Sequence, residues 1–137
     1  MVSVDSINIS TKFKNSMVKQ ALKEAPNECC GVLLGRNNII ERIVPMQSTD
    51  PSPDTYFMDP VQQVEMFAEM EKRGESLLGI YHSHPAGPRQ PSGADLQLAF
   101  HPEAVYIIVS LKDSQNPEVG AFLLAKGEFK EIKIEYI

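Results

Sequence analysis

The sequence predicts one domain of the α/β (α+β) class, with helices flanking a mixed, largely antiparallel β-sheet. Short apolar runs bounded by turn residues predict strands, and two longer segments with helical periodicity predict helices. With 137 residues, 42% of them apolar, the chain is long enough to bury a core without disulfides or a structural metal. No repeat, low-complexity tract or second domain is visible, so residues 1–137 are predicted to form a single domain.

The first third of the chain predicts a strand, a helix and a hairpin. Proline disfavours helical geometry in the residue before it, so the first helix should end ahead of Pro26. The next strand is a continuous apolar run, and its partner alternates in polarity. In order, the predicted elements are a strand at 7–9, a helix capped by Ser10 or Thr11, and antiparallel strands at 29–34 and 39–44 joined by a turn at 36–38.

The rest of the chain begins with a proline-rich loop at 45–58, predicted to be either a solvated connector or a substrate-contacting flap. Asp59 and Pro60 then form a strong helix start, with Gln62 completing a capping box. Apolar residues at helical spacing in this helix, namely Val61, Val64, Phe67, Ala68 and the methionines, are predicted to face the core. The remaining predicted elements are the end of this helix at Gly74, a strand at 77–82, a helix at 93–100, and strands at 105–110, 119–125 and 129–137.

Composition limits the classes of partner and compartment. A formal charge of −5 and a pI near 5.2 argue against a nucleic-acid surface. No apolar run has the length of a membrane span and residues 1–5 lack a leader pattern, so a cytoplasmic protein is expected. Cys29 and Cys30 are adjacent, which excludes an ordinary disulfide framework; we interpret them as reduced packing residues and not as metal ligands.

The segment Tyr81-His82-Ser83-His84-Pro85 carries the chemistry of the chain. On an extended strand His82 and His84 point to the same side, about 7 Å apart at their Cα atoms. Asp95, eleven residues after His84, could supply a carboxylate from the next element. Three protein ligands leave the fourth position of a tetrahedral zinc for water, which is typical of a catalytic site.

Two alternatives remain open from the residues alone. Ser92-x-x-Asp95 ahead of an apolar run also has the form of a capping box, and an Asp95 that reached back to cap the helix could not also point at a metal. His101 has no partner at ligand spacing and is interpreted as a helix-end residue.

His82-x-His84-Pro85 and Ser92-x-x-Asp95, with Pro26-x-Glu28-x-Cys30-Gly31 upstream, resemble the JAMM (MPN-plus) metallopeptidases of the small prokaryotic type. The resemblance spans nearly the whole chain and implies a curved sheet of the JAMM/cytidine-deaminase-like kind. It also implies zinc held by His82, His84 and Asp95, Glu28 as general base, and Ser92 as hydrogen-bond donor to the oxyanion.

The resemblance further implies hydrolysis of a peptide or isopeptide bond after the Gly-Gly tail of a ubiquitin-like or sulfur-carrier protein. The alternative is a metal-free MPN-type scaffold, but scaffold members lose at least one of the five site residues, and all five are present here. A DNA-repair-associated relative is disfavoured by the Glu28–Gly31 segment and by the acidic charge. The sequence leaves the oligomeric state open, with a homodimer as one option. Arg89 and Gln90 are expected to lie in a solvated loop or to touch substrate.

Overall fold

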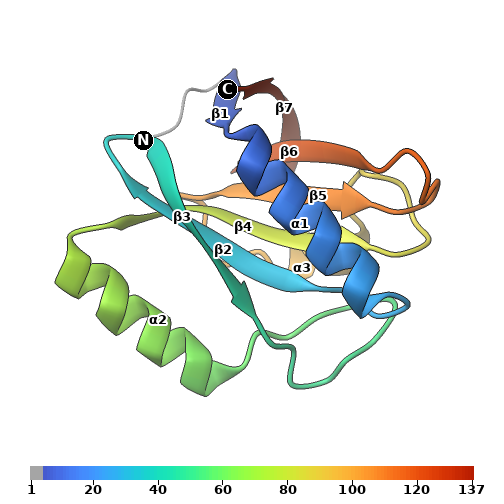
Figure 1. The fold of residues 1–137 in the computed structure, drawn as a ribbon, viewed down its shortest axis with the longest axis horizontal. Helices are drawn as coiled ribbons and strands as arrows, with labels where there is room; N and C mark the ends of the chain where they lie inside the picture. The colour runs from blue at the N-terminus through green and yellow to red at the C-terminus, as the bar shows by residue number, and fades with distance from the viewer. Residues whose placement is uncertain (1–4) are drawn as a thin grey trace.

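Seven strands make one sheet, in the order β1-β7-β6-β5-β4-β2-β3, in the computed structural model, which describes residues 5–137 (Figure 1). Neighbouring strands are antiparallel except for the β1–β7 and β4–β5 pairs, which are parallel. The strands are β1 (Ser6–Ile9), β2 (Cys30–Arg36), β3 (Ile39–Met46), β4 (Ser76–His84), β5 (Val105–Ser110), β6 (Glu118–Ala125) and β7 (Glu128–Tyr136). The prediction of a mixed, largely antiparallel sheet is confirmed.

Three helices accompany the sheet: α1 (Thr11–Glu24), α2 (Pro60–Arg73) and α3 (Gly93–Gln97). The predicted order of elements is correct, several boundaries shift by one or two residues, and two of the differences bear on the site. β4 continues to His84, so both histidines belong to the strand, and α3 ends at Gln97 instead of residue 100 because its chain leaves helical geometry at the Leu98 cap. The predicted absence of a leader concerns mostly residues 1–4, which lie outside the described part.

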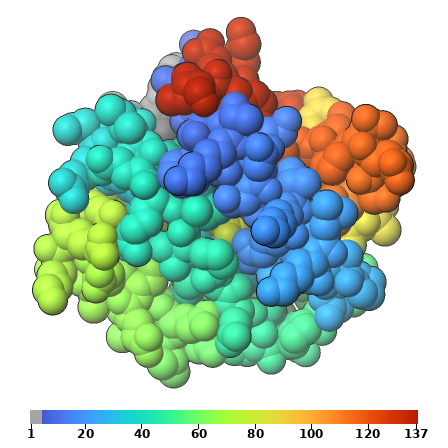
Figure 2. Space-filling model, viewed as in Figure 1, coloured from blue at the N-terminus to red at the C-terminus, as the bar shows by residue number. Residues whose placement is uncertain are grey.

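The two faces of the sheet carry separate apolar cores. α1 begins at the Ser10 cap, whose hydroxyl accepts from the Lys12 N–H at 3.2 Å, and it packs Met17 and Ala21 against one face. Figure 1 shows α1 crossing this face, and in Figure 2 its side chains cover the middle of the molecule. The opposite face is packed by a second cluster that includes Met66 of α2 and Tyr106 of β5. No helix within residues 5–137 combines the length and apolar character of a membrane span.

α2 confirms its predicted ends and part of its predicted apolar face. Asp59 caps the helix and Gly74 ends it in the left-handed conformation, with φ of 68°. The side chain of Gln62 does not close a capping box, because it accepts a hydrogen bond from the backbone N–H of Gln47 at 2.7 Å. Val61 and Val64 are 65% and 70% exposed. Phe67 and the methionines Met66 and Met70 pack against the sheet as predicted.

Candidate active site

Strand β4 delivers two histidines to one point at the centre of the sheet. It lies between β2 and β5, with Cys30 opposite His82 on one side and Ser110 beside His84 on the other. Because side chains alternate along a strand, Tyr81 packs into the α1 core while His82 and His84 project from the other face. Both imidazoles are almost fully buried, with side chains 2% and 8% exposed. The strand therefore fixes their direction.

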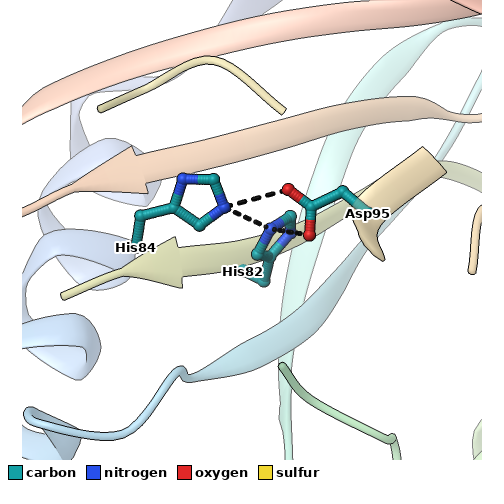
Figure 3. A group of neighbouring side chains, drawn as sticks. All are labelled: His82, His84 and Asp95. Atoms are coloured by element: carbon teal, nitrogen blue, oxygen red, sulfur yellow. Dashed lines mark hydrogen bonds and ion pairs between the residues drawn. The ribbon is translucent and has the colours of Figure 1, made fainter. Parts of the chain in front are cut away.

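Helix α3 brings Asp95 onto the two imidazoles (Figure 3). The Nε2 atoms of His82 and His84 lie 3.1 Å apart. Asp95 Oδ1 lies 3.1 Å from His82 Nε2, and Oδ2 lies 2.9 Å from His84 Nε2. The ligand atoms all fall within 4.8 Å of one another. Two imidazole nitrogens and a carboxylate aimed at one point can hold a divalent transition metal, and this donor set suits zinc.

Asp95 caps α3 and faces the histidines at the same time. Its Oδ2 accepts the Ser92 backbone N–H at 2.8 Å, and Ser92 Oγ accepts the Asp95 N–H at 3.1 Å, which completes a capping box. The expectation that capping would exclude a metal-facing Asp95 is wrong. A carboxylate has about four lone-pair sites, so one oxygen can serve the cap while both remain turned toward the imidazoles.

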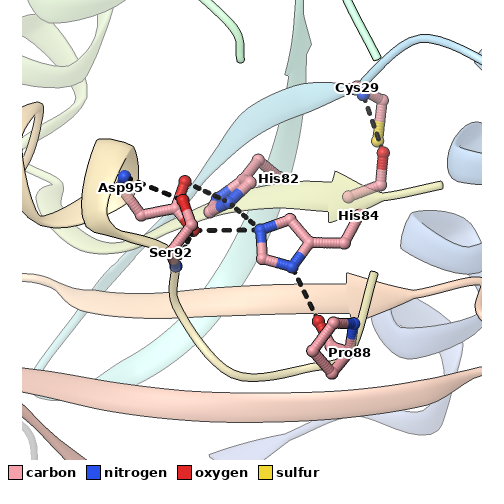
Figure 4. Close-up of polar contacts among 7 residues, drawn as sticks. Cys29, His82, His84, Pro88, Ser92 and Asp95 are labelled. Carbon is pink, nitrogen blue, oxygen red and sulfur yellow. Dashed lines mark hydrogen bonds and ion pairs between the residues drawn. The ribbon is translucent and has the colours of Figure 1, made fainter. Parts of the chain in front are cut away.

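A backbone carbonyl orients His84 (Figure 4). The Nδ1 of His84 lies 2.7 Å from the carbonyl oxygen of Pro88, so Nδ1 carries a proton and donates it, and Nε2 is the ring nitrogen that faces Asp95 and His82. The loop that supplies this carbonyl is itself tied down, since Ser110 Oγ donates to the Gly87 carbonyl at 2.6 Å. Neither Pro88 nor Ser110 was predicted to take part.

His82 is held by packing instead. Its ring stacks on Tyr56 with centroids 4.8 Å apart and planes 29° apart. Its Nδ1 is buried and has no hydrogen-bond partner within the described residues. Tyr56 comes from the 45–58 loop, and that loop is braced by the Ser48–Met58 bridge. The loop is thus part of the wall of the site.

The electrostatics favour the proton-free forms of Asp95 and His82 but hold a proton on His84. Burial opposes ionisation of Asp95, but hydrogen bonds from His82 and His84 outweigh it and hold the pKa of the carboxyl well below its usual range. Burial lowers the pKa of His82, against the attraction of Asp95. Burial also acts to lower the pKa of His84, but the Asp95 carboxylate and the Pro88 carbonyl together raise it. A proton on His84 must leave before Nε2 can bind a metal.

Glu28 lies just before β2 and is only 4% exposed. Its backbone N–H donates to the Ser52 carbonyl at 2.8 Å, which ties it to the 45–58 loop. Burial raises the pKa of Glu28 to about 8, with Asp95 and Asp54 adding to the shift and His84 opposing it. Its Oε1 is buried and makes no hydrogen bond to any described residue. Burial of a carboxyl group without a hydrogen-bond partner destabilises the folded state, and groups with such raised pKa values are common at functional sites.

A cavity of about 430 Å³ opens beside these groups. Glu28, His84 and Ser92 line this cavity together with residues of the 45–58 loop and of the loop after β4. Its lining residues are Glu28, Pro53, Asp54, His84, Ala86, Gly87, Pro88, Gln90, Pro91 and Ser92. A substrate in this cavity would meet the candidate base, one candidate ligand and the serine hydroxyl together.

The remaining candidates lie away from this chemistry. Cys29 and Cys30 are free and fully buried, and burial raises their thiol pKa values to about 11 and about 12, so neither is a ready thiolate. His101 lies 6.1 Å from Phe67, ring centre to ring centre, and lines a separate apolar cavity of about 150 Å³. Tyr56 lines that cavity too and separates it from His82.

Comparison with known proteins agrees with this geometry. Residues 10–125 match the family described as prokaryotic homologs of the JAB domain. The CysO-cysteine peptidase of Mycobacterium tuberculosis is 34% identical over 131 residues, covering 94% of this chain and 90% of that protein. A Thermus thermophilus protein, named a probable TtuB-protein conjugate cleaving protease, is 40% identical over 108 residues, covering 78% of this chain and 68% of that protein. A protein from Desulfitobacterium hafniense, solved in solution, has a TM-score of 0.85 at 38% identity and covers 96% of this chain and 92% of its own.

Fold, site and relatives together define an enzyme of the JAMM peptidase class. Within that class, the chain belongs to the family of prokaryotic homologs of the JAB domain. The recognition made from the sequence motifs is confirmed, as is the prediction of an enzyme. The metal-free scaffold, the alternative open at the level of sequence, is not supported.

Proposed function

We propose that this chain is a zinc-dependent peptidase that hydrolyses the bond after the Gly-Gly tail of a ubiquitin-like or sulfur-carrier protein. One observation carries the proposal. The imidazole nitrogens of His82 and His84 and the carboxylate of Asp95 converge within 4.8 Å, and the unpaired carboxyl of Glu28 lines the cavity that His84 also lines. Ligand geometry and a separate acid–base group are the two requirements of metal-assisted amide hydrolysis.

His82, His84 and Asp95 would hold the zinc. When bound, zinc would polarise the scissile carbonyl and make a water nucleophilic near neutral pH. Neighbouring groups orient all three residues. The Pro88 carbonyl fixes the tautomer of His84, Tyr56 fixes the ring of His82, and the capping box fixes Asp95.

Glu28 would move the proton. In its ionised form, which the positive charge of a metal held by His84 would favour, the carboxylate of Glu28 would accept a proton from the attacking water and deliver it to the amine that leaves, so that the carbon–nitrogen bond breaks to a neutral amine. The role requires a carboxyl that reaches the cavity without being tied to a cation. Glu28 meets this requirement, since no ion pair involves it among the described residues.

Ser92 would stabilise the oxyanion. Its Oγ uses a lone pair to accept the Asp95 N–H at 3.1 Å, and this leaves the hydroxyl proton free to donate into the cavity that Ser92 lines. A donor aimed at the developing charge stabilises the transition state more than the ground state. The capping and catalytic roles of Ser92 are therefore compatible.

The substrate proposal comes from the relatives. One is named for CysO-cysteine and one for TtuB–protein conjugates. We extend from these names to a carrier protein with an extended C-terminal tail. We also propose the cytoplasm as the site of action, because two free buried thiols suit a reducing compartment.

The test is mass spectrometry of a sulfur-carrier or ubiquitin-like protein extended past its Gly-Gly end, incubated with the zinc-loaded enzyme. We expect cleavage after the second glycine, loss of cleavage on chelation, and recovery when zinc is restored. Intact substrate with zinc confirmed in the protein would contradict the proposed substrate. Cleavage that persists after complete chelation would contradict the zinc-dependent mechanism.

A further inference from the structure

The backbone beside Glu28 departs from the regular pairing between β2 and β4. Cys30 lies opposite His82 in the register of these antiparallel strands, so Cys29 lies opposite Ser83. Two residues paired in this way normally exchange two hydrogen bonds between their main chains. Here the Ser83 N–H donates to the Cys29 carbonyl at 3.1 Å, but the Cys29 N–H donates to the Ser83 hydroxyl oxygen at 2.8 Å. A side chain of β4 therefore takes the place of a main-chain acceptor.

This hydrogen bond acts on the peptide group that joins Glu28 to Cys29. The group is planar, so an acceptor that holds its N–H also fixes the direction in which the chain leaves the Cα atom of Glu28. On the other side of that Cα atom, the Glu28 N–H donates to the Ser52 carbonyl at 2.8 Å. Glu28 is thus held at both neighbouring peptide groups, once by the 45–58 loop and once by Ser83.

The carboxyl of Glu28 depends on this backbone support. Its Oε1 is buried and has no hydrogen-bond partner among the described residues. A general base must lie within hydrogen-bond reach of the proton that it removes, about 2.6–3.2 Å between heavy atoms. A misplacement of about 1 Å at an active site can cost about 100-fold in rate. The group that orients the backbone of Glu28 therefore bears on catalysis.

Ser83 lies on the face of β4 opposite to the candidate metal ligands. It is fully buried, and the alternation of side chains along the strand turns it to the α1 side together with Tyr81, away from His82 and His84. β4 is a central strand, and Ser83 is paired with Val109 of β5 on the side away from β2. One strand thus presents metal ligands on one face and a hydroxyl that supports the base on the other.

The start of β2 is anchored independently of Ser83. The Cys30 carbonyl accepts a hydrogen bond from Gln20 Nε2 of α1 at 3.0 Å, and the Tyr81 hydroxyl donates to Gln20 Oε1 at 2.5 Å. These contacts do not involve the Ser83 side chain. Loss of its hydroxyl should therefore loosen the chain at Glu28 while β2 stays in place.

We propose that Ser83 is a positioning residue for catalysis, whose hydroxyl holds the Glu28–Cys29 peptide group so that the Glu28 carboxyl reaches the attacking water. The inference rests on the proposed function, since it takes Glu28 as the base. It adds a residue that touches neither the metal nor the substrate and acts through Glu28 alone.

The experiment measures the effect of Ser83→Ala in two backgrounds. In the otherwise wild-type, zinc-loaded enzyme, we expect kcat for a carrier extended past Gly-Gly to fall about tenfold with KM unchanged. With Glu28→Gln already present, Ser83→Ala should cause no further loss, because the base through which Ser83 acts is gone. Ser83→Thr keeps a hydroxyl at this position and should restore most of the lost kcat.

Two measurements do not depend on turnover. Competition with a zinc chelator should give the same zinc affinity for the wild type and Ser83→Ala, because the ligands lie on the other face of β4. In the chelated proteins, hydrogen exchange at the Cys29 amide should be faster in Ser83→Ala than in the wild type, because that amide has lost its acceptor.

Tyr106→Phe is the matched control. The Tyr106 hydroxyl oxygen also accepts a backbone N–H, that of His101, at 2.9 Å. Tyr106 is buried on β5 and lines the separate apolar cavity, not the cavity of Glu28. Both Ser83→Ala and Tyr106→Phe leave a backbone N–H without its acceptor and should lower thermal stability. Only Ser83→Ala should lower kcat.

The outcomes separate the inference from the function on which it rests. Wild-type kcat in Ser83→Ala, or a Ser83→Thr protein no faster than Ser83→Ala, would overturn the role of the hydroxyl. An equal loss from Ser83→Ala in both backgrounds, a weakened zinc affinity, or a similar loss of kcat in Tyr106→Phe would overturn its action through Glu28. A zinc-loaded Glu28→Gln protein with wild-type activity would overturn the proposed function itself, and the inference with it.

Discussion

His82 and His84 lie two residues apart on β4, but one is enclosed by packed side chains and the other borders an open cavity. His82 is closed in: its ring stacks on Tyr56, its Nδ1 has no partner in the described chain, and burial lowers its pKa. His84 borders the open cavity, its Nδ1 bonds the Pro88 carbonyl, and its pKa is raised. One flank of the site is made by packing and the other by hydrogen bonds from loops.

The two flanks of the site therefore have different roles. The closed flank extends the apolar core to the site and orients the ring of His82 by stacking, with no described partner for its Nδ1. The open flank holds the groups proposed to act on a substrate, namely His84, Glu28 and Ser92, which share the cavity of about 430 Å³. Changes on the closed flank should therefore act mainly on stability, and changes on the open flank mainly on turnover.

The largest effect is expected at Asp95, which joins the two flanks by facing both histidines. Asp95→Ala removes a candidate ligand and should weaken zinc binding by about 100-fold or more, with loss of hydrolysis. It also removes half of a cap, but capping alone is worth about 1 kcal/mol of stability. Competition with a calibrated zinc chelator measures the affinity. An Asp95→Ala protein that binds zinc as tightly as the wild type would show that Asp95 is only a cap.

The next effect concerns Glu28 in the metal-free protein. Its pKa rises from 4.5 to about 8 on folding, so the folded state holds a proton that the unfolded state has lost between these values. Stability from this group is present below pH 4.5 and is lost as the pH rises to about 8, on the order of 5 kcal/mol in all. Glu28→Gln should remove this slope. Urea unfolding of both chelated proteins across that range measures it, and parallel curves would show that Glu28 is not buried as described.

Ser92→Ala separates capping from catalysis on the open flank. Loss of an oxyanion donor should lower kcat by about 100-fold, with little change in KM. Loss of the cap should cost about 1 kcal/mol of stability. Steady-state kinetics below the melting transition distinguish the two. Unchanged kcat with lower thermal stability would leave Ser92 as a cap alone.

The smallest effect on turnover is expected at Tyr56 of the closed flank. Tyr56→Ala removes the ring that stacks on His82 and should destabilise the protein by about 2 kcal/mol. Tyr56→Phe keeps the stack and is the matched control, with stability and kcat close to the wild type. Thermal unfolding of the two variants measures the difference. If Tyr56→Ala lowered kcat more than Ser92→Ala did, the division between flanks would be wrong.

Most of the fold and part of the site could be predicted from sequence because they depend on local pattern. The two-residue period of a strand puts His82 and His84 on one side, and Asp59, Pro60 and Gly74 set the ends of α2. The apolar face of α2 was predicted correctly for Phe67 and the methionines but wrongly for Val61 and Val64, because apolar side chains occur on more than one side of that helix and contact with the sheet decides which are buried.

Contacts between distant segments could not be predicted. Tyr56 belongs to a loop without regular pattern, and its ring meets His82 only through the fold. The contribution of Pro88 is a carbonyl oxygen, which every residue possesses and no sequence reveals. The sequence suggested that Asp95 could either cap the helix or face a metal, because it does not show how the two carboxylate oxygens are placed. In the structure Oδ2 accepts the Ser92 N–H and lies near His84, and Oδ1 lies near His82.

In the proposed mechanism Glu28 moves the proton while His82, His84 and Asp95 hold the metal. The most direct measurement takes zinc content and hydrolysis of a Gly-Gly-extended carrier from the same preparations of wild type and Glu28→Gln. We expect stoichiometric zinc in both, with cleavage by the variant about 1,000-fold slower. A zinc-loaded Glu28→Gln protein that cleaves at the wild-type rate would contradict the account.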